Sequence, residues 1–261
     1  GQKILPLKAY CASFKQRWLT DCYLTILEKD ELSEYFDNIT FDYLILNNLF
    51  GSNSDINEDK RRIKEALKSN PDITLIINAD EPNFYDIDKE NKIKKIYFGI
   101  NSVDFIKNTE EVSGENDLKC PICYLSELSF KKRYYSHIGK YECRCGFKRP
   151  NVDISADVKV FNDYCLMNVY YKGDKSVYKI PIGSIYNAYN ALCAISFCMI
   201  EEIKRKQITG AFENYSYLKA RDEIKICKNK EVKIKLVKDE VSFTQAIREL
   251  YSSKKTSVIF C

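Results

Sequence analysis

The sequence predicts an α/β protein with a mostly parallel sheet, an inserted four-cysteine loop and the start of a second α/β domain. Two observations lead to this prediction. Short apolar segments alternate with helical patterns and end in polar residues, which is typical of a doubly wound parallel sheet with ligands at its strand ends. A C-x-x-C pair followed by a C-x-C pair interrupts this alternation in the middle of the chain, and such spacing indicates a metal-binding loop.

The first half of the chain contains the elements of the parallel sheet. Residues 1–20 are weakly patterned and predict a short helix. Four short apolar segments then predict strands, namely Cys22–Leu27, Phe41–Leu46, Ile73–Ile77 and Lys95–Ile100. Between the second and third segments, Asp55–Leu67 has apolar residues at helical spacing and predicts an amphipathic crossover helix.

The second half of the chain changes character. Asp157–Tyr171 and Val177–Ile182 alternate and are rich in Val and Tyr, which predicts an antiparallel pair of strands. Ile185–Lys206 is the longest helical pattern. Beyond a polar and aromatic stretch, strands are predicted at Glu223–Cys227 and Lys233–Val237, and a helix at Ser242–Leu250. We therefore expect a central domain at residues 1–215 and an incomplete second domain at 216–261.

The cysteine loop lies at about residues 116–150 of the central domain. Its four cysteines are Cys120, Cys123, Cys143 and Cys145, and nineteen residues separate the second from the third. Each pair lies beside turn residues, which suits two hairpin knuckles that offer four thiolates to one structural Zn²⁺. A disulfide-bonded hairpin and unliganded thiols are the alternatives. A closed shell of four protein ligands would hold the loop together and catalyse nothing.

Composition narrows the class of protein. Of the 261 residues, 45% are apolar and 30% are charged, which is typical of a globular protein. The 41 basic and 37 acidic residues are mixed along the chain, which argues against a dedicated polyanion binder. An odd number of cysteines (11), several of them in apolar contexts, and the lack of a signal-peptide pattern predict a cytoplasmic protein. The first residue is Gly1 and not methionine, so we expect a fragment.

Four polar segments follow predicted strands or open predicted elements, and the cysteine loop lies between the second and third. They read L-E-K-D-E at residues 27–31, N-A-D-E-P at 78–82, G-S-I-Y-N-A-Y-N-A at 183–191 and A-R-D-E at 220–223. The loop itself reads Y-S-H-I-G-K-Y-E-C at 135–143 and ends C-G-F-K-R-P at 145–150. In this order, from about Cys22 to the end, the chain resembles the MurT family, the Mur-ligase-like subunit of lipid II isoglutaminyl synthase.

The resemblance implies an ATP-dependent ligase subunit that amidates the D-glutamate of lipid II with ammonia from a GatD-type glutaminase. It also implies roles for single residues. Asn78 and Asn187 would contact the adenine, with Asp80 nearby, since an amide can both donate to and accept from a base edge. Arg221 would bind the ribose or phosphates and Glu28 would help hold Mg²⁺, roles that suit a guanidinium and a carboxylate.

The chain also departs from the family pattern. It contains no G-x-x-x-x-G-K-[ST] segment, whose backbone cradles phosphates. Ser184 and Ala220 stand where the family motifs have glycine, and Cys261 falls just before the position of a D-G-R-D-x-S-W segment. We therefore expect the chain to be inactive as it stands, with no measurable ATP hydrolysis.

Each of these residues also has a simpler interpretation. Asn78–Pro82 contains turn-forming residues and can be a strand-terminating turn. Asn187 and Asn190 can be helix-cap and surface residues. Glu28 can belong to a solvated helix N-terminus, and Arg221 can be a surface arginine.

Two other functions remain open at this stage. One is a non-catalytic scaffold that keeps the fold and a partner surface. The other is a zinc-ribbon module for nucleic acid, because aromatic rings are interleaved with basic residues around the cysteines. The rings are those of Tyr134, Tyr135, Tyr141 and Phe147. The only histidine, His137, can be a hydrogen-bond donor to a metal ligand or a hydrogen-bonded core residue.

Overall fold

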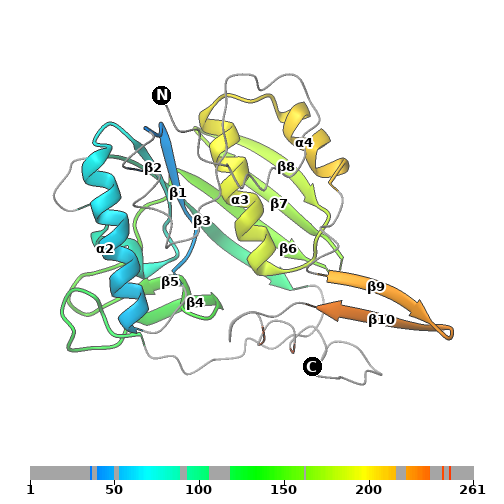
Figure 1. Cartoon of the computed structure of the whole chain (residues 1–261), viewed down its shortest axis with the longest axis horizontal. Coiled ribbons are helices and arrows are strands. Elements are labelled where there is room, and N and C mark those ends of the chain that lie inside the picture. Colours follow the sequence, from blue (N-terminus) through cyan, green and yellow to red (C-terminus); the bar gives the residue numbers. More distant parts are fainter. Residues whose placement is uncertain are drawn as a thin grey trace, which may run out of the picture.

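A computed structural model describes residues 36, 40–49, 53–88, 93–105, 118–161, 163–215, 222–235, 243 and 247. Within these residues, a six-stranded sheet has the order β1-β2-β3-β6-β7-β8 (Figure 1). Its strands are β1 (Tyr43–Leu46), β2 (Thr74–Asn78), β3 (Lys94–Phe105), β6 (Ile154–Val160), β7 (Cys165–Tyr171) and β8 (Asp174–Ile180). The three pairs from β1 to β6 are parallel and the two pairs from β6 to β8 are antiparallel. The mostly parallel α/β fold predicted from the sequence is confirmed.

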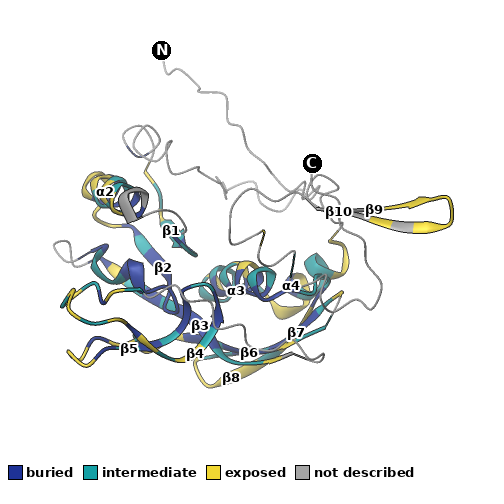
Figure 2. Cartoon of the chain, turned by 90° about the horizontal axis from the view of Figure 1, so that it is seen from below, coloured by how far each residue is buried: buried dark blue, intermediate teal, exposed yellow. Residues whose placement is uncertain are grey.

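Helices pack on both faces of the parallel part of the sheet. Helix α2 (Asn53–Ser69) forms one core with Leu75 and Ile77 of β2, whereas Ile76 belongs to the core under α3 (Ile185–Ile200). Successive residues of a strand point to opposite faces, so β2 contributes to both cores and is buried along most of its length (Figure 2). This double burial explains the uninterrupted apolar sequence of β2.

The antiparallel part of the sheet differs from its prediction. The segment predicted as one strand, Asp157–Tyr171, forms two strands, β6 and β7, joined by a tight turn. The N–H of Phe161 donates to the carbonyl of Tyr164 at 2.9 Å, and the two rings stack 4.3 Å apart. The Asn-Asp dipeptide at 162–163 favours a turn, and the alternating Val and Tyr pattern conceals it.

The long helix predicted at Ile185–Lys206 is confirmed up to Ile200 and is wrong beyond it. Helix α3 ends at Ile200, and a separate helix, α4 (Arg205–Glu213), follows. Glu202 adopts a left-handed conformation (φ 54°), and the N–H of Ile203 donates to the carbonyl of Cys198 at 2.8 Å. This is the hydrogen bond of a helix stop that usually contains glycine. Because no glycine marks the position, the apolar periodicity overestimates the helix length. As a result, α3 is not the longest described helix, since α2 is one residue longer.

The cysteine loop contributes its own small sheet. Strands β4 (Ser129–Tyr135) and β5 (Ile138–Glu142) pair antiparallel, and they follow directly on the first cysteine pair. The short helix η1 (Pro82–Asp86) leaves the carboxyl end of β2 and packs beside this loop, with the rings of Tyr85 and Phe147 5.1 Å apart. The loop therefore adjoins the end of β2.

The remaining described strands, β9 (Asp222–Cys227) and β10 (Lys230–Lys235), form an antiparallel hairpin (Figure 1). Its side chains at residues 225–230 and 232 are exposed (Figure 2). The predicted domain boundary near residue 215, the strand at Cys22–Leu27 and the helix at residues 1–20 lie outside the described residues or beside their gaps, so they stay predictions. In the part of the chain that the structure describes, no helix combines the length and hydrophobicity needed to span a bilayer.

Candidate metal centre

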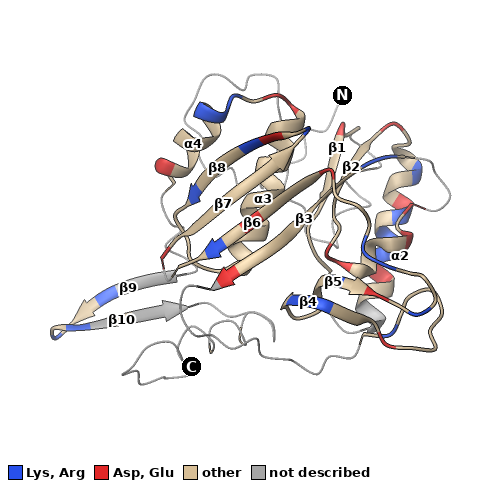
Figure 3. Ribbon diagram, turned by 180° about the vertical axis from the view of Figure 1, so that it is seen from behind, with Lys and Arg blue, Asp and Glu red and all other residues tan. Residues whose placement is uncertain are grey.

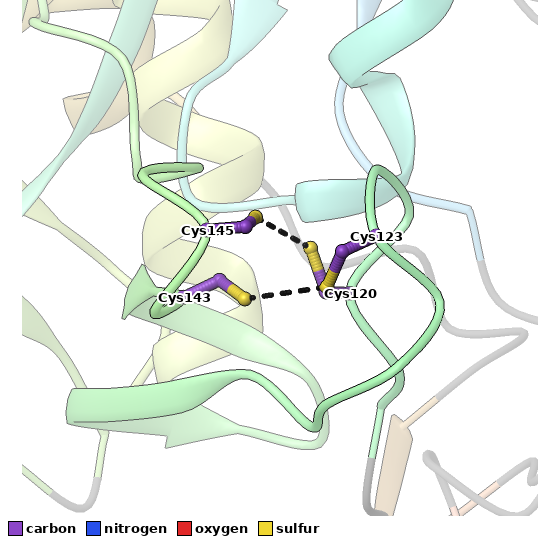
Figure 4. A group of neighbouring side chains, drawn as sticks. All are labelled: Cys120, Cys123, Cys143 and Cys145. Atoms are coloured by element: carbon purple, nitrogen blue, oxygen red, sulfur yellow. Dashed lines mark hydrogen bonds between the residues drawn. The ribbon is translucent and has the colours of Figure 1, made fainter.

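The structure brings the four cysteines of the loop together (Figure 4). The Sγ atoms of Cys120 and Cys145 lie 3.6 Å apart, and those of Cys123 and Cys143 lie 3.7 Å apart. All four Sγ atoms lie within 4.8 Å of one another. The two cysteine pairs therefore form one cluster of four potential ligands, as the sequence predicts.

The distances between the sulfurs distinguish a metal site from disulfides. A disulfide bond is about 2.05 Å long, and all four cysteines are free thiols. A tetrahedral ion with metal–sulfur bonds of about 2.3 Å separates its ligands by about 3.8 Å. The observed 3.6 Å and 3.7 Å match the edges of such a tetrahedron. The cluster therefore has the composition and approximate spacing of a site for one metal ion.

The first knuckle stabilises a thiolate. The Ser126 hydroxyl lies 3.4 Å from Cys123 Sγ and 3.3 Å from Cys143 Sγ. Its hydrogen bond, followed by backbone donors of Leu125 and Ser126, lowers the pKa of Cys123 to about 6. Because the thiolate and not the thiol binds metals, these donors favour the ligand form of the side chain.

The second knuckle depends on a glycine. Gly146 has a φ of 93°, and its N–H donates to the carbonyl of Cys143 at 3.0 Å. Side chains rarely adopt this backbone conformation. The turn that brings Cys143 and Cys145 to the same point therefore favours glycine at position 146.

The carboxyl end of β2 is tied to the cysteine loop through Asp80. The Asp80 carboxylate is fully buried and forms an ion pair with Arg149, which follows the second knuckle. Its other oxygen accepts the N–H of Ile100 and the hydroxyl of Tyr189, both at 2.7 Å. Burial raises the pKa of the Asp80 carboxyl, and Arg149 and these donors oppose that rise. One buried carboxylate thus joins β2, β3, α3 and the loop.

A second link joins Glu81 to His137, in the turn between β4 and β5. His137 Nε2 lies 2.8 Å from Glu81 Oε2, which also accepts the N–H of Leu49 at 3.0 Å. Glu81 Oε1 accepts the N–H of Asn83 and caps helix η1. Burial lowers the pKa of His137, but the Glu81 carboxylate outweighs it and leaves the pKa above its ordinary value. His137 is a buried hydrogen-bonded residue whose partners include this carboxylate.

The structure places some of the predicted nucleotide residues. Asn78 and Asp80 are fully buried, and the Asn78 amide bonds to the carbonyl of Asn47 and the N–H of Asp80. Asn187 lies half-buried in the first turn of α3, where its N–H donates to the Ser184 hydroxyl that caps the helix. Their contact with nucleotide stays a prediction. Glu28 and Arg221, predicted for Mg²⁺ and for ribose or phosphate, lie outside the described residues.

Sequence reasoning missed four residues that organise this region. Glu81, Tyr189 and Arg149 lie within the motifs quoted above, but the motifs indicate no role for them. No motif marks Gly99, although a Cβ there would collide with the Arg149 guanidinium. Glycine at 99 allows the guanidinium to approach β3. These roles arise from contacts between residues up to 109 positions apart, which no local pattern shows.

A cavity of about 430 Å³ lies elsewhere, at the amino ends of β1 and β2. It is lined by residues 40–43 and 69–74. Ligands of open α/β sheets bind at the carboxyl ends of strands. The cavity is therefore at the opposite end of the sheet from Asn78, Asp80 and the cysteine cluster.

Comparison with known proteins identifies the family. No protein-family profile matches the chain. The MurT subunit of lipid II isoglutaminyl synthase (glutamine-hydrolyzing) from Streptococcus pneumoniae R6 is 30% identical over 235 residues, which cover 86% of this chain and 50% of the relative. The chain is a MurT-like protein. The MurT subunit from Staphylococcus aureus COL is 27% identical over 230 residues, with 86% and 51% covered. The chain thus spans about half the length of the curated relatives it matches.

Solved structures show the same fold. A pseudomurein peptide ligase type C from Methanothermus fervidus superposes with a TM-score of 0.63 at 23% identity, over 80% of this MurT-like chain and 41% of the ligase. A UDP-N-acetylmuramoylalanyl-D-glutamyl-2,6-diaminopimelate–D-alanyl-D-alanyl ligase from Acinetobacter baumannii gives a TM-score of 0.53 at 11% identity, with 82% and 38% covered. At these identities the likeness concerns the fold alone, which is that of the Mur ligases.

Proposed function

We propose that this chain is part of an ATP-dependent ligase subunit that amidates the D-glutamate of lipid II in peptidoglycan synthesis. The similarity to MurT subunits over 86% of the chain supports this proposal most strongly. The Mur-ligase fold and the cysteine cluster inserted into it agree with it. A GatD-type glutaminase would supply the ammonia.

The chemistry of the proposed reaction is amide formation. The glutamate carboxylate attacks the γ-phosphate of ATP and ADP leaves, which gives an acyl phosphate. Ammonia then attacks the acyl carbon and phosphate leaves. In the described residues, Asn78 and Asp80 expose no side-chain atoms and already have hydrogen-bond partners. We therefore assign no step of the reaction to them.

We further propose that the cysteine cluster binds Zn²⁺ and that the ion is structural. Four cysteine sulfurs within 4.8 Å of one another, two pairs of them near the edge length of a tetrahedral site, suit zinc. A shell closed by four protein ligands leaves no position for water or substrate. Its place next to η1 and the end of β2 indicates that it fixes the loop against the sheet.

The decisive experiment is an amidation assay with the complete natural gene product. Purified protein, a GatD-type glutaminase, lipid II, glutamine and Mg-ATP are combined, and mass spectrometry identifies the stem peptide as acid or amide. We expect the amide only when all components are present. For the 261-residue chain alone, we expect no phosphate release from ATP, because it has no phosphate-binding G-x-x-x-x-G-K-[ST] segment. Amide formation without the glutaminase or its glutamine, or robust ATP hydrolysis by the chain alone, would contradict the proposal.

A second candidate function is a non-catalytic scaffold. The side chains of Asn78 and Asp80 are buried and hydrogen-bonded within the protein, which favours this candidate because neither side chain is exposed to a nucleotide. Nucleotide binding separates the two candidates. The complete natural gene product of a ligase subunit gains thermal stability with ATP and Mg²⁺, whereas that of a scaffold that has lost the site shows no shift.

A further inference from the structure

The first knuckle of the cysteine loop exposes apolar side chains at its tip. Ile122, Tyr124 and Leu125 are 45%, 71% and 92% exposed. The N–H of Tyr124 donates to the carbonyl of Cys120 at 3.0 Å, so the turn is closed and its side chains point away from it. A small cluster of exposed apolar residues at the tip of one turn suggests a contact surface.

The same segment carries an excess of positive charge. Residues 118–150 contain eight basic and two acidic residues, a formal net charge of +6, whereas the whole chain has +4. The rest of the chain is therefore slightly acidic. Five of the basic side chains are exposed, namely Lys119, Lys131, Lys132, Arg144 and Lys148. Figure 3 shows basic residues on β4.

The cysteine cluster places the apolar tip beside part of this charge. Cys123, in the first knuckle, and Cys143, in the second, have sulfurs 3.7 Å apart. Exposed Arg144 directly follows Cys143, and exposed Tyr124 and Leu125 directly follow Cys123. The exposed apolar residues and the exposed Arg144 therefore flank the same cluster of sulfurs.

The burial of the aromatic rings indicates which anionic partner fits. A nucleic-acid surface needs exposed rings on which bases stack, but Tyr134, Tyr135, Tyr141 and Phe147 are each at most 8% exposed. Among the exposed apolar residues at the tip, two of three are aliphatic and only Tyr124 is aromatic. Aliphatic side chains with one tyrosine and surrounding lysines suit the interface of an anionic bilayer.

We propose that the tip Ile122–Leu125 and the basic residues around the cysteine cluster form a docking surface for an anionic membrane. The apolar side chains enter the interfacial layer, and the lysines and arginines attract the acidic headgroups. The metal centre holds the two knuckles together, so that the apolar tip and the basic residues stay next to each other. This inference stands on the surface alone, so it does not depend on the proposed ligase activity.

Vesicle co-sedimentation tests the proposal. The 261-residue chain is mixed with phosphatidylcholine vesicles that either contain or lack phosphatidylglycerol, at low and high salt. We expect binding to the anionic vesicles only, and weaker binding at high salt. Leu125→Glu should lower the affinity at least about tenfold, because it removes apolar burial and adds a repelled charge. Lys132→Glu should lower it by a smaller factor.

A matched control shows whether the loss of vesicle binding depends on where the negative charge is added. Val177, in β8 and remote in sequence from the loop, is 43% exposed, and Val177→Glu adds the same charge away from the knuckle. We expect it to bind vesicles nearly as the unchanged chain does. The metal content and circular dichroism of each variant verify its fold. Equal binding to neutral vesicles, no binding to anionic ones, equal losses for Leu125→Glu and Val177→Glu, or tighter binding to single-stranded RNA than to vesicles would overturn the proposal.

Discussion

Asp80 is the residue on which most of the contacts at the end of β2 converge. Its carboxylate is 0% exposed and bonds to Arg149, Ile100 and Tyr189. A buried charge that loses its counter-ion costs far more than a surface ion pair that loses a member. Removal of the positive charge of Arg149 should therefore destabilise the folded chain strongly.

Replacing Arg149 with methionine keeps the apolar stem and removes the charge. We expect the free energy of unfolding to fall by about 3–5 kcal/mol, because Asp80 remains buried without its partner. Urea denaturation measures the change. Arg61→Met is the control, because the pairs of Arg61 with Glu58 and Glu65 are exposed on α2. Equal unfolding midpoints for the Arg149 variant and the unchanged chain would show that the ion pair is not structural.

The pair of His137 and Glu81 makes stability depend on pH. Burial lowers the pKa of His137, Arg133 acts in the same direction, and Glu81 raises it enough to leave a net increase. Because the pKa of His137 is raised in the folded state, the pair's contribution to the free energy of unfolding is fully present below the unfolded pKa of about 6.5. It is lost as the pH rises through the folded pKa.

His137→Gln tests this dependence directly, because the chain has one histidine. We expect the unchanged chain to exceed the variant in unfolding free energy most at about pH 5.5, and the difference to shrink towards about pH 8. Denaturant unfolding at several pH values gives this difference. Groups that titrate in the same way in both proteins do not contribute to it. A difference that stays constant with pH, or grows, would contradict the assignment.

Among the elements, the strands of the parallel part were predictable and the helix ends were not. Strand β2 appears as an apolar run because both of its faces are covered, and the half-buried strand β1 is also an apolar run. The end of α3 is set by the left-handed Glu202, a conformation that the sequence does not announce. Likewise, the turn between Phe161 and Tyr164 depends on a ring contact and one hydrogen bond.

Glu202→Gly tests the explanation for the end of α3. Glycine adopts the left-handed conformation without the cost of about 1–2 kcal/mol that other residues carry, although it loses more chain entropy on folding. We expect the unfolding free energy to rise by about 0.5 kcal/mol. Thermal or urea unfolding measures it. Glu201→Gly, at a position with φ −81°, should instead destabilise the chain.

In the whole molecule, the tertiary contact that the sequence predicted best is the one between the two cysteine pairs. Two short cysteine motifs were sufficient to predict a cluster whose sulfurs lie within 4.8 Å, because metal-ligand spacing is itself local. The attachment of the loop could not be predicted. It depends on Asp80 with Arg149 and on Glu81 with His137, pairs that meet only when β2, η1 and the loop are assembled.

We propose that four sulfurs hold one zinc ion, which fixes the cysteine loop to the sheet. The most direct measurement is X-ray absorption at the zinc edge, combined with metal analysis of the 261-residue chain purified without added metal. We predict one zinc per chain with four sulfur neighbours at about 2.3 Å, and loss of the metal in Cys120→Ser and Cys143→Ser but not in Cys227→Ser. A chain that folds without zinc, or zinc bound by nitrogen or oxygen, would contradict the account.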